Sequence, residues 1–177
     1  TAQLDETLRS NTVQLFSAGK TFNLSGNTIG IAHFNDKKRQ NSFNQFLTRF
    51  HLNGVNVFTT TALEVVYNEG EPWFNELLAY VEENLEYVEM RVKEELPPVK
   101  LFKPEGTYLL WLSFASYGFK GRELEKLLIE KARLALDPGR WFGEQYSAYA
   151  RLNIGCSREL LTIALDRIVS LFEEYSI

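Results

Sequence analysis

The sequence offers little for metal, disulfide or membrane chemistry. Its 177 residues include two histidines and a single cysteine, Cys156, so neither an internal disulfide nor a cysteine-rich zinc site is expected. No apolar run reaches the roughly 20 residues that a membrane-spanning helix needs. The formal net charge of −4 gives no general attraction to nucleic acid or to an anionic membrane. With no secretory signal visible either, we expect a cytoplasmic protein without metal, nucleic-acid or membrane partners.

The composition is that of a folded chain. Hydrophobic residues make up 45% and charged residues 24% of the sequence, which excludes disorder, collagen and a coiled-coil rod. A chain of this length can bury a real core in one domain or in one domain and a small part. No phosphate-loop or dinucleotide-binding fingerprint is present.

The first 75 residues combine short strands with helices. Apolar runs at 12–16 and 28–34 predict strands, the first of them buried and running into a turn of small residues. Asp36 is expected to cap a helix, because phenylalanine and leucine recur after it at helical spacing. A further helix is expected over 56–67, and residues 4–9 are too short to assign.

The clearest element is a helix over 71–95. Pro72 lies in its first turn, apolar residues follow one stripe, and Pro97-Pro98 ends it. At about 1.5 Å per residue it would be close to 40 Å long, which suits a strut between two lobes.

Beyond the prolines, the pattern predicts a small antiparallel α+β lobe. The expected elements are strands at 99–103 and 107–114, a helix at 122–132, a turn at 136–139, a strand at 150–156, and a last helix capped by Ser157.

Two positions at the end of the first strand are candidates for chemistry. Lys20 follows the small residues Ser17-Ala18-Gly19, and a lysine that forms an imine must lose its proton in a desolvated site or beside a cation. We expect the end of a buried strand to supply such a site. The hydroxyl of Ser17, with nearby backbone N–H groups, is suited to a phosphate. Taken alone the pattern is weak, because most lysines are solvated surface charges and most turn serines are ordinary.

Arg151 lies among apolar residues in the predicted strand Ala150–Ile154. Such an arginine is either an edge residue in solvent or a buried fork that awaits a carboxylate. The residues themselves leave both possibilities open.

Together, several segments resemble the class I/II aminotransferase superfamily, and within it the cystathionine β-lyase or C–S lyase subgroup. The resemblance runs from about Val13 to the end of the chain, and the segments that carry it are Ser17–Gly26, Asn53–Asn56 with Ala62, Glu71–Trp73 and Ala150–Ser157. It implies pyridoxal 5′-phosphate as cofactor and fold type I. It also implies that Lys20 binds the cofactor covalently and moves the Cα proton, that Ser17 contacts its phosphate, and that Arg151 binds the substrate α-carboxylate.

The resemblance also predicts the organisation of the chain. Residues 1–75 correspond to the last part of a large mixed-sheet, cofactor-binding domain, and residues 76–177 to the long connecting helix and the small antiparallel α+β domain. The family's N-terminal half, with the aromatic that stacks on the cofactor ring and the aspartate that pairs with the pyridine nitrogen, has no counterpart here. We therefore expect a C-terminal fragment of a homodimeric enzyme that is inactive alone.

Two positions depart from the family pattern. Gly19 stands where the subgroup often has serine, and Thr28 stands where many relatives have a phosphate-binding arginine. Three functions stay open: a C–S β-lyase that releases pyruvate, ammonia and a thiol, an aminotransferase of amino acids, and an inactive or regulatory module of the same fold. Lys20 and Arg151 do not distinguish the first two, because both reactions share their first steps.

Overall fold

The computed structural model describes residues 5–27 and 30–175. Thr28 and Ile29, for which expectations were stated above, lie outside this part of the chain. The chain divides into two compact units, Thr1–Glu76 and Leu77–Ile177, which are described separately. Among the described residues, no helix is long and apolar enough to cross a membrane.

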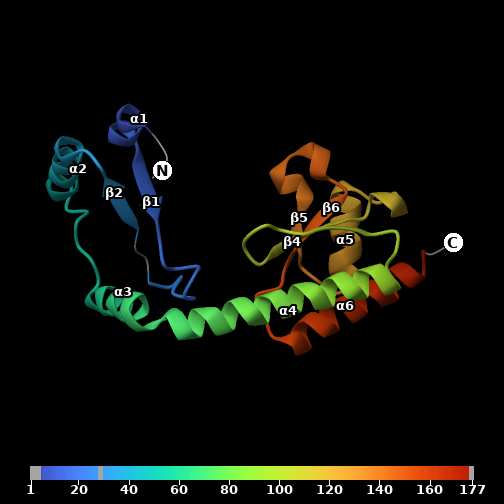
Figure 1. Cartoon of the computed structure of the whole chain (residues 1–177). Coiled ribbons are helices and arrows are strands. Elements are labelled where there is room, and N and C mark those ends of the chain that lie inside the picture. Colours follow the sequence, from blue (N-terminus) through green and yellow to red (C-terminus); the bar gives the residue numbers. More distant parts are fainter. Residues whose placement is uncertain (1–4, 28–29, 176–177) are drawn as a thin grey trace. The chain divides into compact units, whose positions relative to one another are not determined.

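The first unit contains short helices and one strand pair (Figure 1). Its elements are α1 (Glu6–Asn11), β1 (Val13–Phe16), β2 (Ile31–Phe34), α2 (Lys37–Arg49) and α3 (Val57–Glu69). Side chains cap all three helices: Asp5 accepts from Leu8 N–H, Asp36 from Arg39 N–H and Asn56 from Phe58 N–H. The predicted strands and helices of this part are thus confirmed in type, while α1 was not predicted, because six residues give too little periodicity.

The expectation of a buried first strand is wrong for this chain. β1 pairs antiparallel with β2, with Val13 opposite Phe34 and Phe16 opposite Ile31. Leu15 is nevertheless 78% exposed, and Val13 and Phe16 are exposed as well. The sheet described in this unit has two strands, and two strands with few covering elements cannot bury both faces of an apolar strand.

The second unit is an antiparallel sheet with helices. Helix α4 (Glu71–Glu95) begins in the first unit and continues into the second. Then follow β3 (Lys100–Phe102), β4 (Leu109–Ser113), η1 (Ala115–Tyr117), α5 (Gly121–Glu130), β5 (Asp137–Pro138), η2 (Gly139–Phe142), η3 (Glu144–Tyr146), β6 (Tyr149–Asn153) and α6 (Arg158–Glu173). The strand order is β3-β4-β6-β5, and every pair is antiparallel. The predicted lobe is confirmed, except that the expected turn at 136–139 contains the two-residue edge strand β5.

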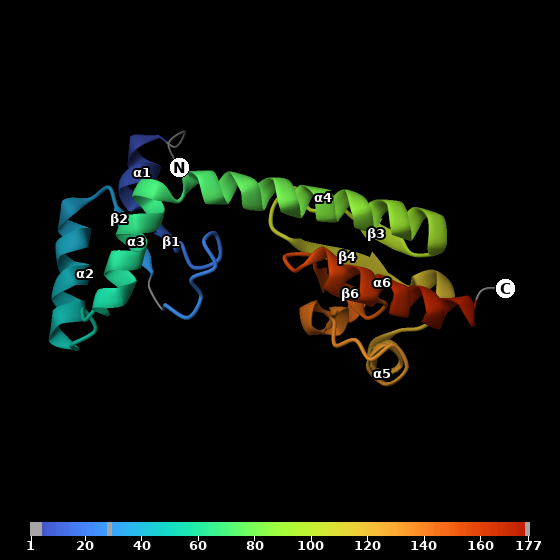
Figure 2. The same cartoon turned by 90° about the horizontal axis from the view of Figure 1, so that it is seen from below.

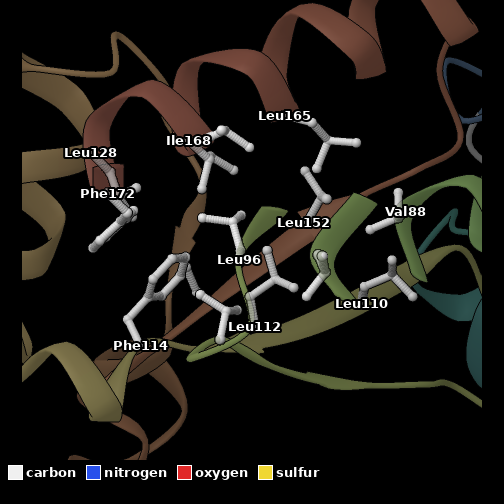
Figure 3. Close-up of a cluster of buried hydrophobic side chains, with 14 of the residues drawn as sticks. Val88, Leu96, Leu110, Leu112, Phe114, Leu128, Leu152, Leu165, Ile168 and Phe172 are labelled. Carbon is white, nitrogen blue, oxygen red and sulfur yellow. The ribbon is translucent and has the colours of Figure 1, made fainter. Parts of the chain in front are cut away.

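One face of this sheet carries the core of the unit. Leu110 and Leu112 on β4, with Ala150 and Leu152 on β6, alternate inward along their strands and are buried. Figure 3 shows Leu165 and Ile168 of α6 pointing toward Leu152 and Leu96, with Phe172 near Phe114. The rings of Phe114 and Phe172 stack at 4.8 Å. The side chains between these strand positions point to the opposite face, where Arg151 lies.

Helices α4 and α6 lie side by side and run in the same direction (Figures 1 and 2). Polar pairs join them in ascending order: Asn84 with Arg158, Tyr87 with Thr162, and Arg91 with Asp166. Arg91 also pairs with Glu95, and this hydrogen bond raises the pKa of the guanidinium above its ordinary value. The C-terminal half of the long helix is therefore packed against α6 within the second unit.

Asn84 is the polar centre of this packing, and its replacement should be costly. The side chain is fully buried, its Nδ2 donates to the carbonyl oxygens of Ile154 (2.9 Å) and Cys156 (3.0 Å), and its Oδ1 accepts from Arg158 Nε (2.8 Å). Asn84→Ala should lower the free energy of unfolding by about 3 kcal/mol, since buried polar groups lose their partners. Denaturant unfolding measures this loss. The exposed neighbour Glu83 provides the control Glu83→Ala, and equal stability of the two variants would contradict the role of Asn84.

Candidate functional site

Lys20 is an exposed residue in a turn that follows β1. The turn closes through two backbone bonds, from Phe22 N–H to the Ala18 carbonyl (3.0 Å) and from Leu24 N–H to the Gly19 carbonyl (2.8 Å). Ser17 Oγ accepts a hydrogen bond from Gly19 N–H at 3.1 Å. The turn therefore places the Ser17 hydroxyl and the Lys20 amine in one short, hydrogen-bonded segment.

Phe22 anchors this turn to the junction between α3 and α4. Its ring lies 6.1 Å from that of Tyr67, 6.2 Å from that of Trp73 and 5.8 Å from that of Phe74. At Gly70, an added Cβ would lie 2.8 Å from the Phe22 ring and 2.4 Å from the Val66 carbonyl oxygen. Glycine at this position therefore permits the close approach of Phe22. This half-buried aromatic cluster fixes where the lysine turn lies on the first unit.

The desolvated environment expected for Lys20 is not provided by the described residues. Its side chain is exposed, and no hydrogen bond or ion pair reaches it within residues 5–27 and 30–175. Ala18 and Gly19, just before it, are buried. The backbone of the turn is thus shielded, while the amine itself is open to a ligand.

Arg151 lies on β6 in the second unit, in a cross-strand row on the face opposite the core. The register places Phe102 of β3 opposite Trp111 of β4, Trp111 opposite Arg151, and Arg151 opposite Asp137 of β5. Directly opposed residues share one face of a sheet. The Arg151 side chain is 27% exposed on a strand that lies between β4 and β5, so it is neither an edge residue in solvent nor a fully buried fork.

The carboxylate that Arg151 binds in this structure belongs to the chain itself. Arg151 donates from Nε (3.1 Å) and from Nη2 (2.7 Å) to the same oxygen, Asp137 Oδ2. The guanidinium carbon lies 4.7 Å from the centre of the Phe142 ring, a cation–π distance. The arginine is therefore held from one side by charge and over one face by an aromatic ring.

Aromatic side chains gather around Trp111, the cross-strand neighbour of this arginine. Trp111 makes ring contacts with Phe142 (5.0 Å), Tyr146 (6.0 Å) and Tyr149 (6.2 Å). Several of these rings remain open to solvent, as Phe142 is 42% and Tyr146 41% exposed. The outer face of the sheet thus forms an amphipathic surface with one fixed cation.

The structure brings Ser17 and Lys20 together in the first unit and places Arg151 in the second. Asp137 was not predicted as a site residue, because Leu-Asp-Pro-Gly is typical of a turn and only the strand register brings it opposite Arg151. Phe22 was missed as well, since its partners lie 45 or more positions away in sequence.

Cys156 is not a nucleophile candidate, because burial raises the pKa of its thiol. No group of three or more potential metal ligands occurs among the described residues.

Comparison with known proteins places this chain in a family. The family model for aminotransferase class I and II matches residues 2–168. The chain belongs to the class I and II aminotransferase family.

Members of this family resemble the chain along nearly its whole length. It is 36% identical to cystathionine β-lyase PatB of Bacillus subtilis over 94% of the chain and 43% of that protein. A pyridoxal-phosphate-bound protein of Clostridium difficile 630, provisionally described as an aminotransferase, is 35% identical with a TM-score of 0.89, over 94% of this chain and 43% of that one. Cystalysin from Treponema denticola, whose structure contains pyridoxal 5′-phosphate, has a TM-score of 0.88 over 97% of this chain and 44% of its own. At 23% identity, cystalysin supports the fold alone.

The chain thus spans less than half the length of the family members that it matches. The expected fold, the C-terminal part of the pyridoxal-phosphate-dependent transferase fold, is confirmed by these structures.

Proposed function

We propose that this chain is the C-terminal portion of a pyridoxal-phosphate-dependent C–S β-lyase of the cytoplasm. The observation that carries the proposal is the match, at 36% identity over 167 residues, to a curated cystathionine β-lyase. The whole enzyme would act on an amino acid with a thiol or thioether at Cβ and release pyruvate, ammonia and a thiol. It would be a homodimer in which the missing N-terminal half completes the site.

The residues present fit the cofactor in part. Lys20 offers an exposed primary amine to the aldehyde, and Ser17, in the same turn, offers a hydroxyl to the phosphate. When bound, pyridoxal phosphate withdraws electrons from the substrate Cα, which acidifies its proton and favours loss of a β-thiol. Residues 1–75 would belong to the large domain and residues 76–177 to the connecting helix and small domain.

Two residues of this chain would act on the substrate. The Lys20 amine would accept the proton from Cα and return a proton later, the role of a positioned general base and acid. The Arg151 guanidinium would bind the α-carboxylate through two parallel N–H donors and thereby fix the orientation of Cα.

An aminotransferase is the second candidate, because one similar solved structure carries that provisional description. The reactions diverge after the shared proton abstraction: a β-leaving group leads to pyruvate, whereas its absence leads to amino-group exchange. Release of pyruvate from L-cystathionine would support the lyase. Exchange with a keto acid and no pyruvate would support the aminotransferase instead. If the full-length protein showed neither activity, the remaining candidate would be an inactive or regulatory module of the same fold.

The test compares the 177-residue chain with the full-length protein that contains it. After addition of pyridoxal phosphate and borohydride reduction, peptide mapping should place the label on Lys20 of the full-length protein. The 177-residue chain should release no pyruvate, since it lacks the carboxylate that keeps the pyridine nitrogen protonated. Labelling of another lysine, or robust lyase activity of the 177-residue chain, would contradict the proposal.

A further inference from the structure

The ion pair between Asp137 and Arg151 is asymmetric, and this asymmetry carries the inference. Both donors that Asp137 binds, Nε and Nη2, lie on one edge of the guanidinium, and both meet Oδ2. A guanidinium has five N–H donors in a planar fork. In the described part of the chain, no hydrogen bond occupies Nη1. The second edge, formed by Nη1 and the remaining proton of Nη2, is therefore available to a bidentate carboxylate.

The backbone that carries Asp137 is firmly held. Pro138, which follows it, is buried, and an added Cβ at Gly139 would lie 2.0 Å from the Tyr146 carbonyl oxygen. Arg140 then binds Glu125 of α5, with Nη2 at 2.6 Å and Nε at 2.8 Å from Oε2. The Asp137 carboxylate is thus a fixed point against which a long, flexible arginine can be oriented.

The exposure of the Asp137–Arg151 ion pair indicates that it orients the arginine rather than stabilises the fold. The side chain of Asp137 is 41% and that of Arg151 27% exposed, and ion pairs this open contribute little to folding stability. An ion pair that adds little to the free energy of folding can still hold the Arg151 side chain in one orientation. Phe142 covers one face of the guanidinium, so the aspartate occupies one edge of the group and the ring one of its faces.

We propose that Asp137 is a positioning residue for Arg151: it binds the Nε/Nη2 edge so that the Nη1/Nη2 edge meets the substrate α-carboxylate. The inference rests on the proposed function and deepens it by assigning a second residue to carboxylate recognition. Without Asp137, the arginine must be ordered at the moment of binding, which weakens the binding of carboxylates by about 3- to 10-fold.

The test uses Asp137→Asn and Asp137→Ala in the full-length protein. With L-cystathionine, both variants should raise KM about 3- to 10-fold and leave kcat within about twofold, with the larger effect for Asp137→Ala. Asp166→Asn is the matched control, because Asp166 of α6 is another aspartate that pairs with an arginine, Arg91 of α4. Inhibition by the carboxylate probe 3-phenylpropionate should weaken in parallel with the rise in KM, whereas any inhibition by the carboxyl-blocked 3-phenylpropionamide should be the same in the variants and the parent protein.

Two results would overturn the inference. A lower KM in Asp137→Asn would mean that the aspartate competes with the substrate for the guanidinium. An unchanged KM, or equal effects on the acid and the amide, would mean that Asp137 does not position Arg151 for a carboxylate.

A binding measurement separates this inference from the proposed enzyme activity. In the ¹⁵N-labelled 177-residue chain, titration with 3-phenylpropionate should shift the Arg151 Nε–H signal, and Asp137→Asn should weaken this binding about 3- to 10-fold. This result would stand even if the full-length protein had no lyase or aminotransferase activity. If the Arg151 signal did not shift in the chain with Asp137 intact, the Nη1/Nη2 edge would not be available to a carboxylate, and the inference would be refuted.

Discussion

Replacing Lys20 by alanine in the full-length protein is expected to reduce pyruvate release about 10²- to 10⁴-fold, the contribution of a positioned general acid and base. The amine is the group proposed to take the Cα proton, and alanine supplies neither a base nor an attachment point for the cofactor. The borohydride-stable label on the peptide that contains residue 20 should disappear as well. Initial-rate kinetics with L-cystathionine and peptide mapping measure the two effects.

The control for this experiment is Lys38→Ala, which removes an exposed lysine from α2 in the same unit. This variant should retain both the rate and the label. Because Lys20 is exposed on its turn, its loss should leave the unfolding midpoint of the cofactor-free protein almost unchanged, which separates chemistry from stability. A Lys20→Ala protein that keeps more than about a tenth of the rate would assign the proton transfer to another group.

Arg151→Gln is expected to raise KM for L-cystathionine about 10- to 100-fold, which corresponds to the loss of one charged hydrogen-bonding partner. Glutamine keeps a polar side chain but loses the charge and the planar fork. Arg151→Lys should recover only part of the affinity, because a lysine binds a carboxylate as a point charge rather than through two parallel donors. Steady-state kinetics across the three proteins measures both effects.

Arg122→Gln is the matched control, since Arg122 is an exposed arginine at the start of α5 in the same unit. Its KM should remain that of the parent protein. A normal KM in Arg151→Gln would place carboxylate binding elsewhere and would remove the basis for assigning a positioning role to Asp137.

The helices were predictable because their signals are local. Asp36 and Ser157 were identified as caps from the sequence, and both accept the expected backbone bonds, from Arg39 N–H and Leu160 N–H. The long helix has the predicted bounds, since Pro97-Pro98 cannot continue it. Such features depend on residues within a few positions of one another.

The environments of the candidate site residues were less predictable. The apolar run at 12–16 indicated a buried strand, yet Leu15 and Phe16 are exposed, because burial depends on what packs against a strand and not on the strand alone. Likewise, no local pattern distinguishes a lysine on an open turn from one in a desolvated pocket.

The sequence by itself determined the family, most of the helices and strands, the bounds of the long helix, and the candidate residues Ser17, Lys20 and Arg151. The tertiary structure alone decided which groups surround them. Strand register set Asp137 and Trp111 on either side of Arg151, and packing of Phe22 between α3 and α4 fixed the lysine turn. Capping and periodicity follow from neighbours along the chain, whereas these contacts join residues 14 to more than 50 positions apart and exist only once the chain has folded.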